Sequence, residues 1–228
     1  MRGLLAAAAF AGVVVGGMPC LGKDVRIGET SVVLTAPPGQ CELDANQPAD
    51  RSLLQAVGVA IGTNTLLAMY ADCKQLTDWR AGKRGLLEDF AQYQVLTSTI
   101  DRPPEGQPAQ ALKELCGYLR DQGEKMATGM ASDLKQRVEQ ALKDVVVNQL
   151  RFLGVVAEDG DACYGAMAQR AKAQTGKDVT IVGLSASAFV KGKLVYYYLF
   201  APYRSGQTVN TLLAKQKLNV AAFLAANK

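Results

Sequence analysis

Residues Leu194–Phe200, with the sequence Leu-Val-Tyr-Tyr-Tyr-Leu-Phe, constrain the fold more than any other stretch. At the two-residue period of a β-strand, both faces of this segment are apolar. Because such a strand is normally covered on both faces, we expect it to lie centrally in a layered domain. Lys191-Gly192 before it predicts a tight hairpin turn, and Pro202 ends the strand because proline has no N–H for the ladder.

Other hydrophobic patterns supply the rest of a mostly antiparallel sheet and its helices. They predict a hairpin over 25–34 and strands over 65–71, 90–96, 145–157 and 179–190. Residues 162–173 are alanine-rich and favour a helix by propensity, but their place in a meander favours a strand. Helices are expected over 109–122, over 133–144 with Ser132 as N-cap, from the N-cap Asp50 to Ile61, and over 209–226 after the cap Thr208.

No repeat or linker divides the chain, so these elements predict one α+β domain over residues 23–228. Helices on both faces of the sheet would make it an α/β/α sandwich. The N-terminus has Arg2, an apolar run over 4–15 and small residues up to Gly22, which is the layout of a signal peptide over residues 1–22. The alternative is a membrane anchor, but the run is shorter than the roughly 20 residues that span a bilayer. We therefore expect a periplasmic or secreted protein whose mature chain does not insert into the membrane.

Export favours disulfide bonds. Cys20 would leave with the signal peptide, and four cysteines would remain. Four cysteines allow three pairings, and positions at element ends lead us to expect Cys41 bonded to Cys73. We expect Cys116 to pair with Cys163, and the alternative for these two is a pair of buried free thiols. No C-x-x-C spacing indicates a zinc ribbon or a redox pair.

The composition excludes several kinds of chemistry. The chain has no histidine, which rules out Ser-His-Asp and Cys-His catalysis and histidine-ligated metal sites. It has no phosphate-binding or dinucleotide motif, so no cofactor is expected. The formal charge of +4 is spread along the sequence, which argues against nucleic-acid binding. Residues 183–187, Gly-Leu-Ser-Ala-Ser, lack the closing glycine of a nucleophile elbow. Residues 158–161 could bind calcium, but we favour a solvated turn and predict no metal site.

Weak binding candidates remain. Arg80, Lys83 and Arg84, beside Trp79, could hold an anion or a sugar edge; the alternative is a solvated basic loop, over 79–85, around one buried tryptophan. The tyrosines at 196, 197, 198 and 203 could line an aromatic groove, although core packing is the favoured interpretation. Among them Tyr203 is the best candidate for exposure.

Three segments carry a resemblance to a known family. They are 34–44 (Leu-Thr-Ala-Pro-Pro-Gly-Gln-Cys-Glu-Leu-Asp), 89–95 (Asp-Phe-Ala-Gln-Tyr-Gln-Val) and 191–203 (Lys-Gly-Lys-Leu-Val-Tyr-Tyr-Tyr-Leu-Phe-Ala-Pro-Tyr). The mature chain resembles an uncharacterised family of exported proteins from alphaproteobacteria, and its element order resembles the PsbP-like α/β/α sandwich. The second resemblance implies a non-catalytic accessory or binding role.

Three functions are therefore expected in order. The first is a non-catalytic periplasmic module that binds an unknown protein or small ligand. The second is a carboxylate-dependent enzyme acting on cell-envelope material, for which Glu88-Asp89 could supply one acid; the third is a structural envelope protein. Two facing carboxylates in a pocket would favour the enzyme, and an apolar, aromatic-lined groove would favour the binding module.

Overall fold

The computed structural model describes residues 22–141, 145–173 and 178–228, so the predicted signal peptide lies outside the described residues except for Gly22. The strands are β1 (Lys23–Ile27), β2 (Thr30–Leu34), β3 (Gln40–Glu42), β4 (Asn64–Asp72), β5 (Phe90–Leu96), β6 (Val145–Glu158), β7 (Cys163–Ala173), β8 (Asp178–Val190) and β9 (Lys193–Pro202). The helices are α1 (Pro48–Ala60), α2 (Cys73–Arg80), the short 3-10 helix η1 (Thr97–Thr99), α3 (Pro108–Ala141) and α4 (Thr208–Ala225).

The main sheet is antiparallel throughout. Within the described residues it has seven strands in the order β3-β4-β5-β9-β8-β7-β6. The predicted central strand is confirmed, because β9 has three strands on either side of it. The turn that precedes it is also as predicted: Lys191 and Gly192 have φ angles of 48° and 75°, the left-handed values of a tight hairpin. Residues 163–173 form a strand, so position in the meander outweighed helix propensity there.

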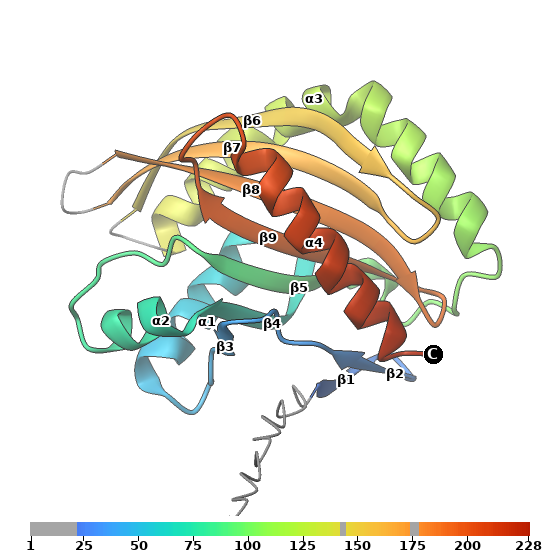
Figure 1. Ribbon diagram of the computed structural model, residues 1–228, viewed down its shortest axis with the longest axis horizontal. Coiled ribbons are helices and arrows are strands. Elements are labelled where there is room, and N and C mark those ends of the chain that lie inside the picture. Colours follow the sequence, from blue (N-terminus) through green and yellow to red (C-terminus); the bar gives the residue numbers. More distant parts are fainter. Residues whose placement is uncertain (1–21, 142–144, 174–177) are drawn as a thin grey trace, which may run out of the picture.

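One face of the sheet carries α4 and the separate hairpin β1-β2. Figure 1 shows α4, in red, crossing in front of the sheet. The core on this face centres on the Tyr93 ring, which lies 4.7 Å from the Tyr197 ring and 5.0 Å from the Phe223 ring of α4. Gln216 of α4 is fully buried and donates hydrogen bonds to the carbonyls of Leu184 and Tyr197. The helix is thus fixed to the sheet by polar bonds as well as by apolar contact.

The opposite face is covered by α1 and α3. Figure 1 shows α3, in green, passing behind the upper strands. The helix comes close to β6 at Gly123, where a Cβ atom would lie 2.3 Å from the Phe152 ring. Helices on both faces of an antiparallel sheet agree with the predicted α+β class.

The helix α3 corrects the prediction of two helices over 109–122 and 133–144. It runs unbroken from Pro108 to Ala141. The expected cap Ser132 lies inside it, because the intervening residues Glu124, Lys125, Met126 and Ala127 are good helix formers. Two glycines, without a proline, were too weak a signal to interrupt the helix.

Two predicted helix caps and one predicted loop were also wrong. Asp50 does not cap α1, because Pro48 occupies the first turn and Gln47 is the N-cap. Thr208 is the first residue of α4, and its hydroxyl accepts from the N–H groups of Arg204 and Ser205 instead. The predicted loop over 79–85 begins inside α2, a helix whose cap is Asp72: its side chain accepts from the Gln75 N–H at 2.9 Å.

Both predicted disulfide bonds are present. Cys41 of β3 is bonded to Cys73 of α2, with Cα atoms 4.9 Å apart, and Cys116 of α3 is bonded to Cys163 of β7, with Cα atoms 5.6 Å apart. The first bond ties the edge strand to α2, and the second ties α3 to the sheet. None of the helices in the described ranges has the length and hydropathy needed to cross a bilayer.

Candidate binding cavity

A cavity of about 620 Å³ lies between the sheet and the helices α1 and α3. This volume falls in the range of about 300–1,000 Å³ that is typical of small-molecule sites. The cavity is on the face opposite α4, and six strands of the sheet, β4 to β9, contribute residues to it, together with the helices α1, α2 and α3. It is therefore a space between layers and not a surface depression on one element.

The floor of the cavity is a row of aromatic rings. Phe90 of β5 and Phe200 of β9 are cross-strand partners, and their rings stack at 4.4 Å between centroids. Tyr198 continues the row, with its ring stacked on Phe200 at 6.1 Å. Gly183 of β8 makes room for this arrangement, because a Cβ atom there would lie 2.6 Å from the Phe200 ring. Gly183, the first residue of the segment 183–187, therefore has a packing role.

The remaining walls are mostly aliphatic. Residues from α1, from α3 and from the outer strands of the sheet line the cavity, among them Leu53, Ala56, Val57, Leu134, Val138 and Met167. Trp79 of α2 closes one part of the wall. Apolar walls with aromatic rings suit a ligand that binds by burial of apolar surface and by ring stacking.

Buried amides form the main polar feature of the floor. Gln92 and Gln94 of β5 line the cavity and are only 5% and 4% exposed. Asn64 Nδ2 donates to Gln94 Oε1 at 2.8 Å, and Gln94 Nε2 donates to Gln92 Oε1 at 2.7 Å. Gln92 Nε2 in turn donates to the Met69 sulfur at 3.9 Å. The amides thus form a chain of hydrogen bonds along one side of the floor.

Charge is scarce in the cavity. No aspartate or glutamate is among the described residues that line it, and Arg137 of α3 is the cation at its rim. The Arg137 guanidinium forms an ion pair with Asp133 at 2.9 Å, one turn away on the same helix. The described part of the lining therefore lacks the paired carboxylates that a glycosidase-type mechanism requires.

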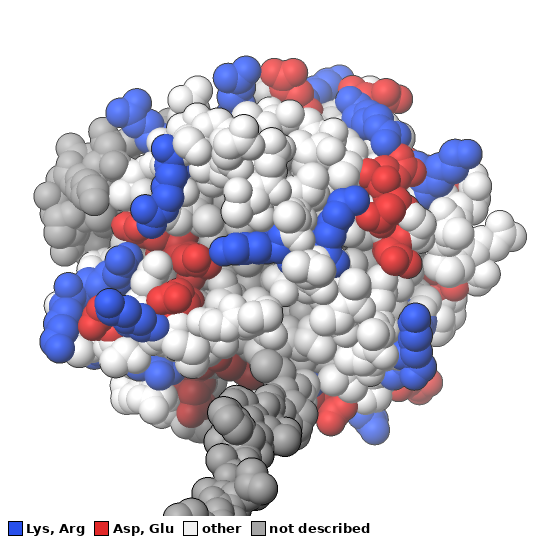
Figure 2. Space-filling view, in the orientation of Figure 1, with Lys and Arg blue, Asp and Glu red and all other residues white. Residues whose placement is uncertain are grey.

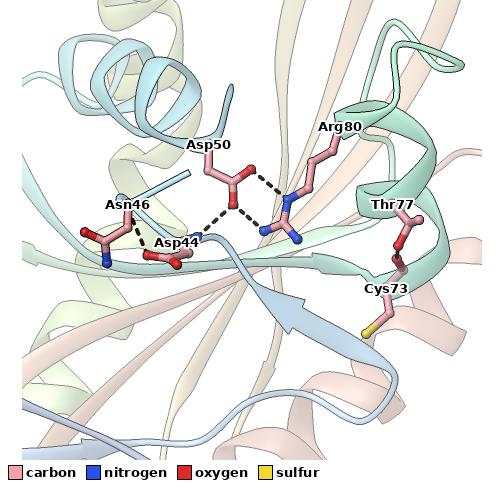
Figure 3. Close-up of polar contacts among 6 residues, drawn as sticks. All are labelled: Asp44, Asn46, Asp50, Cys73, Thr77 and Arg80. Atoms are coloured by element: carbon pink, nitrogen blue, oxygen red, sulfur yellow. Dashed lines mark hydrogen bonds and ion pairs between the residues drawn. The ribbon is translucent and has the colours of Figure 1, made fainter. Parts of the chain in front are cut away.

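The wall formed by α1 and α2 is held in place by a buried ion pair. Asp50 of α1 is fully buried, and Figure 3 shows the Arg80 side chain of α2 bonded to both of its carboxylate oxygens. The Asp44 N–H donates to the same carboxylate at 2.8 Å. Burial alone would raise the pKa of Asp50, but these bonds outweigh it and hold the pKa below its usual value. The pair joins the two helices and leaves Arg80 committed to Asp50.

The sequence-predicted binding residues are not gathered in one place. Trp79 lines the cavity. Arg84 donates to the Gln75 side chain and to the Leu86 carbonyl, so it also has a structural partner. The Lys83 side chain is exposed, and Tyr203, which is 51% exposed beyond the cavity lining, has the exposure that was predicted for it.

The other sequence candidates have local structural roles. Tyr197 is in the core, as expected, whereas Tyr198 lines the cavity. Asp159 accepts from the N–H groups of Asp161 and Ala162 and forms an ion pair with Lys217 at 3.1 Å. Burial alone would raise the pKa of Asp159, but these contacts outweigh it and lower the pKa. No group of acidic or cysteine side chains suited to a metal occurs among the described residues.

Sequence reasoning missed Gln92 and Gln94. The signal was in the alternation of Phe90-Ala-Gln-Tyr-Gln-Val95, which places both glutamines on one face of a strand. Since β5 lies next to the central strand, that face had to be covered, and two amides on a covered face indicate a polar network or a ligand site.

Opposite charges are interspersed on the face that carries α4. Figure 2 shows Lys and Arg beside Asp and Glu across this face, without a patch of one sign. This distribution differs from the basic face that nucleic-acid binding proteins present.

Comparisons with known proteins add little. No protein-family model matches the chain, and no curated protein is similar enough to count as a relative. Among solved structures, a mutant of the protein Mog1 is 14% identical, with a TM-score of 0.31, and covers 90% of this chain and 92% of its own. The Ran-binding protein Mog1p of Saccharomyces cerevisiae is 13% identical, with a TM-score of 0.30 and the same coverage. At these TM-scores the likeness carries no argument about function.

Proposed function

We propose that this chain is an exported, non-catalytic binding module whose cavity holds a small and largely apolar molecule. The observation that carries the proposal is the cavity of about 620 Å³ between the sheet and the helices α1 and α3. Its aromatic floor and aliphatic walls fit the expectation for a binding module. The described lining contains no carboxylate, so the cavity gives the alternative of a carboxylate-dependent enzyme no support.

Export is part of the proposal. It is supported by the signal-peptide pattern over residues 1–22 and by the two disulfide bonds, which form and persist in oxidising compartments. The resemblance to exported alphaproteobacterial proteins and to PsbP-like sandwiches belongs here too, and it favours an accessory or binding role. Cell fractionation followed by mass spectrometry of the purified chain tests this part: we expect a periplasmic protein that begins near Lys23. An intact N-terminus would contradict it.

A cavity-filling variant tests the binding role. The probe is N-phenyl-1-naphthylamine, an uncharged dye whose emission rises in apolar surroundings. Ala56 lines the cavity from α1, so Ala56→Phe should fill part of it and weaken dye binding about tenfold or more. The exposed Gln55 is on the same helix, outside the cavity lining, and Gln55→Phe is the matched control that should leave binding unchanged. A native chain that does not bind the dye, or an Ala56→Phe variant that binds it equally well, would refute the proposal.

A further inference from the structure

The amides on the cavity floor are hydrogen-bonded in one direction. Gln94 Oε1 accepts from Asn64, and Gln92 Oε1 accepts from Gln94. The carbonyl oxygens of both glutamines are therefore already paired, and the spare hydrogen-bonding capacity at the Gln92 end of the row belongs to the N–H donors of Gln92.

Those donors have a poor partner in the protein. The acceptor for Gln92 Nε2, among the described residues, is the Met69 sulfur at 3.9 Å. A thioether is a weak acceptor. Gln92 is 5% exposed and lines the cavity, so a molecule in the cavity is the partner that can supply the missing bond. A buried amide that lacks a strong acceptor costs free energy, which a ligand oxygen beside it would recover.

The charges around the cavity narrow the ligand class further. The described lining has no carboxylate to pair with a cationic ligand, and its cation Arg137 is already paired with Asp133. A cationic ligand would therefore lose its hydration without gaining a carboxylate partner, and an anionic ligand would have to compete with Asp133 for Arg137. The rings of Phe90, Phe200 and Tyr198 line the cavity side by side, so a flat molecule can pack against this apolar row.

We propose that Gln92 selects the ligand of this cavity: an uncharged, flat and largely apolar molecule with an acceptor oxygen that takes a hydrogen bond from Gln92 Nε2. This inference rests on the binding role proposed above. It adds the ligand class and assigns its polar recognition to Gln92. The control residue is Gln169, a further glutamine of the lining, which lies on β7 and outside the row of amides on β5.

Two probes of nearly the same shape test it, 2-acetylnaphthalene with a carbonyl acceptor and 2-ethylnaphthalene without one. Their affinities for the full chain are measured by equilibrium dialysis. The quantity that matters is the ratio of ketone to hydrocarbon affinity, compared between each variant and the native chain, because this comparison cancels the difference in transfer from water between the probes. In Gln92→Leu we expect the ratio to fall about tenfold from the native value, the loss of one buried hydrogen bond. Gln169→Leu is the matched control and should keep the native ratio.

The outcomes separate the two proposals. If neither probe binds the native chain, the binding role itself fails and this inference with it. If both bind but Gln92→Leu changes the ratio less than twofold, the cavity is a binding site and the assignment to Gln92 is wrong. A fall in the ratio in Gln169→Leu instead would also overturn the assignment. Binding of the hydrocarbon by Gln92→Leu shows that this variant is folded. If Gln92→Leu is not folded, the experiment uses Gln92→Met, whose side chain has a similar length and no N–H donor.

Discussion

Asn227 completes the hydrogen bonding of Val33 as a neighbouring strand would. The Asn227 amide donates to the Val33 carbonyl and accepts from the Val33 N–H, each at 2.8 Å, although the two residues are 194 positions apart. The same amide donates to the Phe223 carbonyl at the end of α4. One side chain therefore joins the last turn of the C-terminal helix to the free edge of the N-terminal hairpin.

Replacing this amide should destabilise the fold. Asn227→Ala removes both bonds to Val33 and should lower the free energy of unfolding by about 1–3 kcal/mol. The exposed neighbour Lys228 makes a control, because Lys228→Ala should change the free energy by less than about 0.5 kcal/mol. Urea denaturation measures the free energy of unfolding of both variants. An equal loss in the two would show that Asn227 does not hold the hairpin in place.

The ion pair of Asp50 and Arg80 should contribute more to the free energy of unfolding than an ion pair on the surface does. Arg80→Ala leaves the fully buried Asp50 carboxylate without its partner and should cost about 3–5 kcal/mol. Lys83→Ala, at an exposed position a few residues further on, should cost little. A double-mutant cycle with Asp50→Ala measures the coupling between the two side chains. A coupling near zero would mean that α1 and α2 are held by apolar contact alone.

The same pair should make stability depend on pH. The pKa of Asp50 is lower in the folded chain than in the unfolded one, so its contribution is fully present above the unfolded pKa of about 3.9. It is lost as pH falls through the folded pKa. The stability difference between native and Asp50→Asn should therefore narrow below about pH 4, when guanidinium denaturation is compared at pH 7 and at pH 3. A difference that stays constant would contradict a lowered pKa.

Replacing Gly183, which lies beside the aromatic row of the cavity floor, should destabilise the fold. Gly183→Ala places a Cβ atom 2.6 Å from the Phe200 ring and 3.2 Å from Met167, and should cost about 1–3 kcal/mol. In a Phe200→Leu background the cost should shrink, because the ring is the closest obstacle. Gly58→Ala, on α1 with nothing within 4 Å of the new methyl group, should instead stabilise the chain by about 0.5–1 kcal/mol. Thermal denaturation of the four variants tests this order.

Each disulfide bond should contribute to stability through the loop that it closes. The sequence separations are 32 for Cys41–Cys73 and 47 for Cys116–Cys163, so loss of either should cost about 3–4 kcal/mol. Paired Cys→Ser variants, compared with the native chain by urea denaturation, measure the two contributions. Non-reducing peptide mapping checks the pairing, and a Cys116 peptide found free would contradict the second bond.

Much of the sheet could be predicted because its strands have clear limits. The run Leu194–Phe200 is bounded by a turn glycine and by Pro202, and Phe90–Leu96 alternates over its whole length, so local chemistry determined both. The helix α2 was missed because it has only eight residues and follows β4 without a loop. No periodicity develops over so short a segment.

The cavity could not be predicted in the same way. Leu53 and Val57 have the spacing of core residues, and nothing in their sequence tells whether the sheet lies in contact with them or some distance away. That distance depends on how α1 and α3 pack together, on the ion pair of Asp50 and on the stacked rings beneath, which are all long-range relationships. The charge of residues 80, 83 and 84 made them binding candidates. Arg80 and Arg84 instead form hydrogen bonds that hold α2 and the loop after it in place.

Trp79 gives this fold a built-in optical readout. It is the only tryptophan in the chain, and its indole lies in the cavity wall. Emission excited at the long-wavelength edge of protein absorption, where tryptophan dominates, would thus come from one known place. A ligand that displaces water from the cavity should shift that emission to shorter wavelength, and the shift would follow occupancy in real time without a dye, a label or an engineered residue.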